Sequence, residues 1–188
     1  MAAQVNGYWN LNNYLYDTYD HWREYCLSHG VNVDFSYGNQ CWDVCAMLWH
    51  QYYLRLETGN GYAYGCWVYK RDVNARFPFT KVETRTGIKR GDCVVFAPSG
   101  LNYTGHIAFA DEDYNGSDYM NFLGQNQGQG ISPGTPSNIR RLNIRTFLGA
   151  FRNSKWQSVT PIPGVKTKTV EKRFPWVIYE RKFRNNHR

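Results

Sequence analysis

The run Tyr37-Gly38-Asn39-Gln40-Cys41-Trp42-Asp43-Val44-Cys45 ends a polar loop and opens a helix. From Cys41 onward, apolar residues recur three and four positions apart as far as Leu56, which predicts an amphipathic helix of about four turns. Gly38-Asn39 supplies a turn residue and an N-cap, so we expect Cys41 in the first helical turn. A thiol there is close to the positive end of the helix dipole and to unpaired backbone N–H groups, and both favour the thiolate. Cys41 is therefore a candidate nucleophile.

Length and composition limit the class of protein. A chain of 188 residues suits one domain with a substantial core, and its 17% aromatic content suits either a carbohydrate- or peptide-binding groove or an aromatic core. No run of about 18 apolar residues is present, so we expect no membrane span. The N-terminus has neither a basic region nor an apolar region of the kind found in signal peptides, so we predict no signal peptide.

The five cysteines lack the spacing of a disulfide framework, which indicates free thiols made in a reducing cytoplasm. Cys45 follows Cys41 by one helical turn and should point into the core. Four of the cysteines are expected to be buried and inert: Cys26, Cys45, Cys66 and Cys93. A zinc site from Cys41, Cys45, His50 and His106 is a weaker alternative, because the paired ligand spacings of zinc proteins are missing.

Charge divides the chain into two parts. Residues 139–188 hold 13 Lys/Arg and 2 Asp/Glu, a balance of +11, whereas residues 1–138 hold 9 and 13, a balance of −4. A basic tail suits an anionic partner such as a wall polymer, nucleic acid or a membrane surface, or it is simply a solvated face. Of these we expect anionic wall polymers and no nucleic acid.

Helical spacing precedes a series of short strands along the chain. Residues 8–30 carry aromatic residues at helical spacing, which predicts one or two helices before the helix at Cys41. Short strands are predicted at Cys93–Phe96, at His106–Ala110, at Tyr119–Asn126 and at Asn143–Phe151. Helices first and a meander of strands afterwards predict an α+β fold, with N-terminal helices packed on an antiparallel sheet.

A cysteine amidase needs a thiolate, an imidazole, a group that orients the imidazole, and oxyanion donors. His106, after a glycine and at the start of a strand, is the best-placed imidazole, although a histidine there is often structural. Asn126, on the return strand, is expected to orient His106 through its ring N–H. The backbone N–H of Cys41 and the side chain of Gln40 are the predicted oxyanion donors.

Three oxygen-bearing side chains stand close to Cys41 in the sequence: Asn32, Asp34 and Asp43. Calcium takes six to eight oxygen ligands, so these residues would be part of a calcium site. Asn and Asp residues also build ordinary turns, which is the alternative explanation.

Several blocks together resemble a known family. The stretch from Asn32 to Asp43 resembles the nucleophile motif of CHAP domains, the cysteine, histidine-dependent amidohydrolase/peptidases, and is most similar to those of phage endolysins. Gly91–Phe96, Gly105–Ala108 and Gly124–Gln127 are similar to later blocks of that family, in the same order. Phe147–Arg152 is similar to the closing strand. The resemblance covers roughly residues 20–152.

The resemblance implies a papain-like α+β fold of the NlpC/P60 type and cleavage of amide bonds in the peptidoglycan of Gram-positive walls. It gives Cys41 as nucleophile, His106 as general acid/base and Asn126 as the orienting residue. Many relatives carry a glutamate where this chain has Gly124, so an acidic fourth member is missing. Relatives that bind calcium do so in the loop before the cysteine, where Asn32, Asp34 and Asp43 match ligand positions. No cofactor is implied as required, and calcium is the candidate.

We accordingly predict a catalytic domain over residues 1–152 and a basic, aromatic tail or linker over 153–188. The predicted enzyme is a cysteine peptidase or amidase: an N-acetylmuramoyl-L-alanine amidase or a stem/crossbridge endopeptidase. It would be a phage endolysin released from the host cytoplasm by a holin, or a lysin carried on the virion. Two alternatives remain: a wall-binding module with a vestigial cysteine site, and a cysteine amidohydrolase of the same fold acting on a non-wall substrate.

Overall fold

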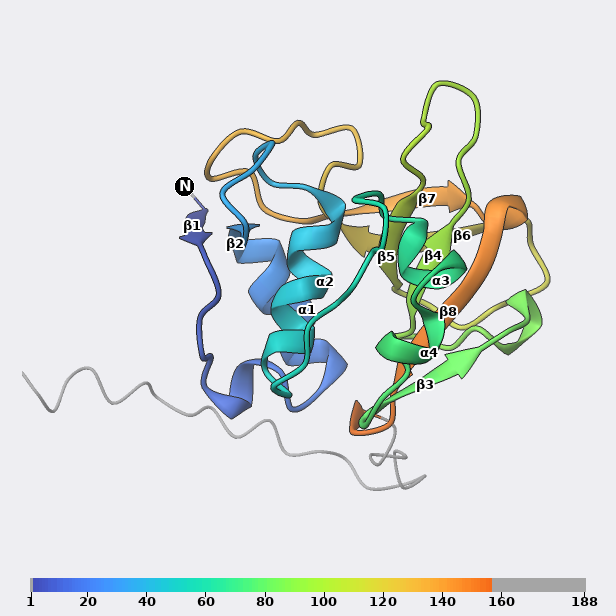
Figure 1. Ribbon diagram of the computed structural model, residues 1–188, viewed down its shortest axis with the longest axis horizontal. Coiled ribbons are helices and arrows are strands. Elements are labelled where there is room, and N and C mark those ends of the chain that lie inside the picture. The colour runs from blue at the N-terminus through green and yellow to red at the C-terminus, as the bar shows by residue number, and fades with distance from the viewer. Residues whose placement is uncertain (1, 157–188) are drawn as a thin grey trace, which may run out of the picture. The chain divides into compact units, whose positions relative to one another are not determined.

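The computed structural model describes residues 2–156, which form two layers, as Figure 1 shows. The helices are α1 (Tyr19–Ser28), α2 (Cys41–His50), α3 (Gly65–Val68) and α4 (Arg71–Asn74), with short 3-10 turns at η1 (Asn13–Leu15), η2 (Arg85–Gly87) and η3 (Ile144–Thr146). The strands are β1 (Ala3–Asn6), β2 (His29–Asn32), β3 (Phe79–Val82), β4 (Cys93–Phe96), β5 (His106–Ala110), β6 (Tyr119–Gly124), β7 (Asn138–Asn143) and β8 (Phe147–Asn153). None of the helices within residues 2–156 has the length and apolar character of a membrane span.

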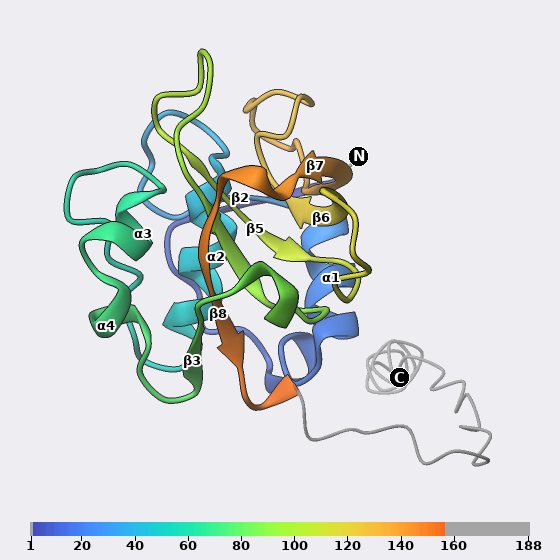
Figure 2. The same cartoon turned by 90° about the vertical axis from the view of Figure 1, so that its right-hand side faces the viewer.

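Six strands form one antiparallel sheet in the order β3-β8-β4-β5-β6-β7, and β1 and β2 form a separate parallel pair. Helix α2 lies between them and packs on both β5 and β2, as Figure 2 also shows. This is the α+β arrangement of helices on an antiparallel sheet that the sequence predicts.

Helix α2 is the centre of the core because it is apolar on nearly every side. Its residues Val44 to Trp49 are all fully buried. At its C-terminal end the Trp49 ring stacks on Phe79 of β3, with centroids 3.6 Å apart, and meets the edge of Phe151 of β8 at 5.7 Å. The helix is therefore fixed to the sheet along its length, and its first residue is fixed with it.

The length predicted for this helix is wrong. The helix ends at His50 rather than near Leu56, because Tyr53 adopts the left-handed conformation with φ of 58°. The N–H of Leu54 donates to the carbonyl of Trp49, and that of Tyr53 to His50, the paired bonds of a Schellman end. Leu56 is buried, but it reaches the core from the segment that follows the helix.

The strand predictions are partly confirmed and partly wrong. Those at Cys93–Phe96 and His106–Ala110 are confirmed with their bounds, whereas β1, β2, β3 and β7 were not predicted. The last strand begins at Phe147, later than the predicted Asn143, because a 3-10 turn precedes it. The return strand ends at Gly124, so Asn126 lies beyond it.

The domain boundary predicted after residue 152 also differs from the structure. Strand β8 continues through Asn153, whose side-chain amide donates to the Tyr52 hydroxyl at 2.9 Å. Trp156 donates its ring N–H to the carbonyl of Tyr16 at 2.9 Å. Residues 153–156 thus belong to the folded body, and the rest of the predicted tail lies outside the described residues.

Candidate active site

Three loops gather at one end of the molecule, at the top of Figures 1 and 2. They are the loop before α2 (residues 33–40), the β4–β5 loop (97–105) and the β6–β7 connection (125–137). The first residue of α2 is Cys41 and the first residue of β5 is His106. Because α2 packs on β5, the two residues meet at this end.

The predicted nucleophile and imidazole are brought together. The side chains of Cys41 and His106 lie close enough to shift each other's pKa, and the backbone of Ile107, the second residue of β5, also acts on the Cys41 thiol. Cys41 is buried and His106 is half-buried. The thiol lies in the first turn of a ten-residue helix, where the helix dipole favours its ionised form.

The two groups shift each other's ionisation in opposite directions. Burial raises the pKa of Cys41, but the imidazole and the Ile107 N–H lower it by more, so the pKa of the thiol lies below its ordinary value. Burial lowers the pKa of His106, but the Cys41 thiolate and Gln127 raise it by more, so the imidazole pKa lies above its ordinary value of 6.5. Such shifts are those of a thiolate–imidazolium pair.

The residue against the far side of the imidazole is Gln127, which corrects the prediction of Asn126. The Nε2 atom of His106 lies 3.0 Å from Oε1 of Gln127. Asn126 is exposed, has a φ of 53°, and donates from Nδ2 to Oε1 of Gln40 at 2.9 Å. The chain leaves the strand at Gly124 and turns, so the side chain that faces the ring is the one a residue later.

Gln40 lies beside Cys41 as the N-cap of α2. Its side-chain Nε2 donates to the carbonyl of Tyr37 at 2.5 Å, while its Oε1 accepts from Asn126. The N-cap is therefore Gln40, one residue later than the Gly38-Asn39 predicted, and one of the two N–H groups of its amide is engaged by the loop.

The three predicted calcium ligands lie around the loop before α2. Asp43 is fully buried and accepts two backbone N–H groups, from Val33 at 2.9 Å and from Gln40 at 2.7 Å. Burial raises its pKa to about 7. Asp34 is exposed and accepts from the N–H of Ser36 at 2.8 Å, whereas Oδ1 of Asn32 is buried with no hydrogen-bond partner.

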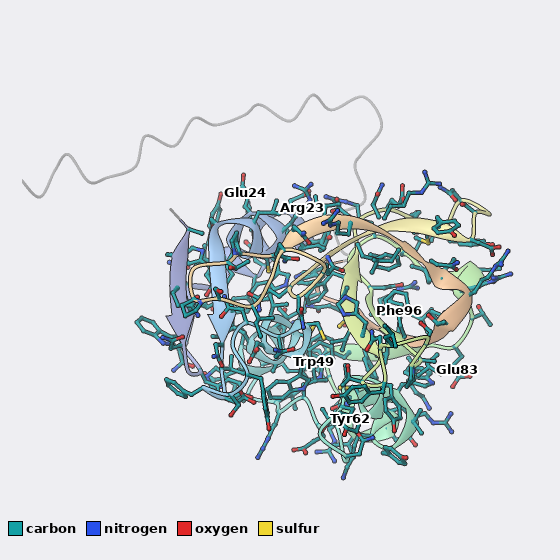
Figure 3. All side chains as sticks on the ribbon, turned by 90° about the horizontal axis from the view of Figure 1, so that it is seen from above. Arg23, Glu24, Trp49, Tyr62, Glu83 and Phe96 are labelled. Atoms are coloured by element: carbon teal, nitrogen blue, oxygen red, sulfur yellow. The ribbon has the colours of Figure 1, made fainter. Side chains whose placement is uncertain are left out.

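Two hollows flank the Cys41–His106 pair. The larger, about 740 Å³, is lined by Cys41 and Gln40 together with Asp34, Glu57 and the aromatic rings of Trp42, Tyr37, Tyr62 and Tyr103. The smaller, about 460 Å³, is lined by His106, Asn126 and Gln127 together with Phe96, Leu142 and Asn143. Figure 3 labels Tyr62 from the first and Phe96 from the second. A ligand that occupied both hollows would lie next to both the thiol and the imidazole.

The remaining cysteines are free and buried, as predicted. Cys45 lies one turn below Cys41 with its sulfur 3.6 Å from that of Cys93 on β4. Burial raises the pKa of both thiols, so neither competes with Cys41 as a nucleophile.

The chain is similar to a phage endopeptidase and shares its fold with an endolysin. It is 33% identical over 150 residues to a D-alanyl-L-alanine endopeptidase of Streptococcus phage B30, a match that covers 77% of this chain and 32% of the relative. The chain thus spans about a third of the length of that curated relative. No protein-family model matches the sequence.

Among solved structures, the endolysin LysIME-EF1 superposes with a TM-score of 0.59 at 22% identity, covering 73% of this chain and 64% of that one. Ly7917 gives a TM-score of 0.42 at 16% identity over 62% of this chain and 55% of its own. The first likeness shows that the chain has the fold of an endolysin structure.

Proposed function

We propose that this chain is a phage endolysin-type peptidoglycan hydrolase that cleaves an amide bond of Gram-positive walls through Cys41 and His106. The observation that carries the proposal is the pairing of a thiol at a helix start with an imidazole at a strand start, between two hollows. The relative named as a D-alanyl-L-alanine endopeptidase favours endopeptidase cleavage over the amidase alternative.

The proposed reaction begins with attack of the Cys41 thiolate on the carbonyl carbon of the scissile amide. The oxyanion that forms would accept from the Cys41 N–H and from the N–H of Gln40 that Tyr37 does not engage. The His106 imidazolium gives its proton to the leaving nitrogen, which departs as an amine. Water then attacks the thioester and loses a proton to His106, which releases the acid and restores the pair.

The two hollows suggest where each half of the substrate lies. The leaving amine must lie beside the imidazole that protonates it, so the amine-side residues fit the smaller hollow at His106. The acyl side then occupies the larger hollow at Cys41, whose rim carries the exposed rings of Tyr37 and Tyr103. Aromatic rims with nearby carboxylates and amides suit a peptide attached to a sugar.

We also propose calcium as a structural ion in the loop before α2. Asn32 offers a buried oxygen without a partner, and Asp34 and Asp43 keep free lone pairs on their carboxylates. Three side chains are fewer than calcium requires, so backbone carbonyls and water would complete the site. A bound cation would offset the cost of burying Asp43 and fix the loop that carries Gln40. Calcium should then raise the thermal midpoint of the protein, and EDTA should reverse the rise.

Binding of anionic wall polymers by the basic tail stays a prediction, since residues 157–188 lie outside the described part of the chain. Release from the host by a holin also stays a prediction. Truncation after Trp156 should weaken wall binding, and added salt should weaken wall binding by the full chain in the same way because it screens the charge of the tail. A loss of binding that is the same at all salt concentrations would contradict it.

The experiment that tests the proposed function is mass spectrometry of fragments released from purified Gram-positive walls. Wild type should release peptides with new amino termini, and N-terminal alanine on them would identify the endopeptidase. Free lactyl carboxylate on the glycan would identify the amidase instead. Cys41→Ala should release neither. If no wall type yields Cys41-dependent fragments, the proposal fails and the binding-module or non-wall alternatives take its place.

A further inference from the structure

Gln127 occupies a buried position that its neighbours fix tightly. The residue is 8% exposed, although it lies in the irregular β6–β7 connection. Its backbone N–H donates to Oε1 of Gln129 at 2.8 Å, and its carbonyl accepts from Nε of Arg140 at 3.0 Å. Because both backbone groups of Gln127 are hydrogen-bonded, the position from which its side chain extends is fixed.

The carboxamide of Gln127 has one permitted orientation. Its nitrogen lies among four oxygens: the carbonyls of Phe122 (3.2 Å), Gly124 (3.3 Å) and Asn138 (3.1 Å), and Oδ1 of Asn138 (3.1 Å). If the amide were flipped, its oxygen would face these acceptors without a hydrogen to donate, which is unfavourable in a buried site. Oε1 therefore faces His106.

That orientation determines the state of the imidazole. An amide oxygen only accepts hydrogen bonds, so Nε2 of His106 must carry its hydrogen to make the 3.0 Å contact. In the neutral ring, Nδ1 is then the unprotonated nitrogen and the one left to face Cys41. This is the tautomer that can accept a proton from the thiol and return it to a leaving amine.

Gly124 makes room for this arrangement. A Cβ atom at Gly124 would lie 3.1 Å from both Cδ and Oε1 of Gln127 and 3.1 Å from Cβ of Ala108. Any larger residue would press on the carboxamide. The space beside the strand end is therefore filled by the side chain of Gln127, which reaches back from three residues later.

We propose that Gln127 is the positioning residue of this site, an uncharged hydrogen-bond acceptor that selects the Nε2–H tautomer of His106 and fixes its ring against Cys41. The inference rests on the proposed function only for its catalytic consequence, because the tautomer can be read without any substrate. Asn126, the neighbouring residue, serves Gln40 instead.

The test uses the full chain with Cys41→Ala, so that the imidazole can be observed without the thiolate, at a pH at which the ring is neutral. Two-bond ¹H–¹⁵N correlation spectra report which ring nitrogen carries the hydrogen, and His106→Gln assigns the signals. We expect the Nε2–H form to dominate in this background. Adding Gln127→Met, which keeps the length of the side chain but removes the acceptor, should allow the Nδ1–H form to appear.

Asn126→Ala is the matched control, since it removes a hydrogen bond from the same connection without touching His106 or Gln127. It should leave the tautomer unchanged. With Cys41 present, Gln127→Met should lower kcat on the order of 100-fold, the lower part of the range for general acid–base catalysis, with little change in KM. An unchanged tautomer in Gln127→Met, or an equal change in Asn126→Ala, would overturn the proposal.

Should Gln127→Met fail to fold, Gln127→Glu gives the test from the opposite direction. With its carboxyl group protonated, it keeps a donor toward the four surrounding oxygens and an acceptor toward His106, so the Nε2–H form should persist. Loss of the Nε2–H form in Gln127→Glu would contradict the assignment. If the Nε2–H tautomer is found as expected but the wild-type protein does not hydrolyse walls, the proposed function fails and the assignment of Gln127 stands.

Discussion

The two sides of the candidate site are built in different ways. Cys41 and His106 stand at the first positions of α2 and β5, regular elements that belong to the main core. Gln127 stands in the β6–β7 connection, which has no regular structure between residues 125 and 137. The proposed reacting groups are thus held by backbone hydrogen bonds and apolar packing, and the proposed orienting group by side-chain amides.

In the β6–β7 connection, glutamine side chains make the hydrogen bonds to backbone groups that regular secondary structure makes elsewhere. Gln125 is buried and bridges both backbone groups of Val31 as well as the carbonyl of Gln40. Gln129 bonds to the backbone at Gly124 and Pro136. Such amides satisfy buried backbone groups that a ladder would otherwise satisfy. The comparison predicts that damage to the regular side costs chemistry or stability outright, whereas damage to the connection costs orientation.

The largest effect is expected at the nucleophile. Cys41→Ala should lower the hydrolysis rate by more than about 1,000-fold, since burial raises the pKa of each of the other four thiols. Its thermal midpoint should stay close to that of wild type, because alanine suits the first turn of a helix. Measured by release of soluble wall fragments, residual activity near wild type would exclude Cys41 as the nucleophile.

The next effect concerns the sheet that carries β5. Arg152 makes two hydrogen bonds to Asp92, at 2.8 and 2.7 Å, and the Asp92 side chain is only 1% exposed. Arg152→Ala leaves this carboxylate buried and unpaired, so we expect a loss of about 3–5 kcal/mol in the free energy of unfolding. Urea titration at neutral pH measures it.

The matched control for that variant is Lys81→Ala, which removes an exposed ion pair between β3 of the same sheet and Asp72 of α4. Its urea midpoint should hardly change. Folded Arg152→Ala should keep the KM of wild type, since the pair touches neither hollow. Equal stability losses in the two variants would show that the buried pair does not hold the sheet.

A smaller effect is expected at Asn126. Asn126→Ala removes one hydrogen bond to Gln40 and nothing from His106, so kcat should fall by less than about 10-fold, the size of one net hydrogen bond. Steady-state rates on soluble wall fragments would compare it with Gln127→Met. A greater loss in Asn126→Ala than in Gln127→Met would restore Asn126 as the orienting residue.

Much of the regular side could be predicted from the sequence, because its signals are local. The apolar spacing after Cys41 places the start of α2, and the short apolar run at His106 places β5. The end of α2 could not be predicted, since it depends on Tyr53 adopting a left-handed conformation that tyrosine seldom takes. β7 was missed because its residues Asn138–Asn143 are mostly polar at the sheet edge.

The residue that faces His106 lies one position after the predicted Asn126. Extending the strand through Asn126 placed that side chain toward His106, but the strand ends at Gly124 and Asn126 turns with positive φ. Side chains alternate sides only while a strand continues, so the pattern fails where the chain turns. The amide-rich run from Gln125 to Gln129 was the available signal, but it does not say which amide faces the ring.

The pH dependence of the site follows from the two shifted groups. The thiolate–imidazolium pair forms as Cys41 loses its proton, below the ordinary pKa of a thiol, and is lost as His106 loses its proton above 6.5. Activity should therefore rise through the first transition and fall through the second.

The most direct test of the central claim, that Cys41 is a thiolate held by His106, is its rate of alkylation by iodoacetamide as a function of pH. Cys41→Ala supplies the background from the four buried thiols. The alkylation midpoint of wild type should lie below the value of about 8.5 for a free cysteine, and His106→Gln should move it upward. A wild-type midpoint at or above that of a free cysteine, or one that His106→Gln leaves unchanged, would contradict the account.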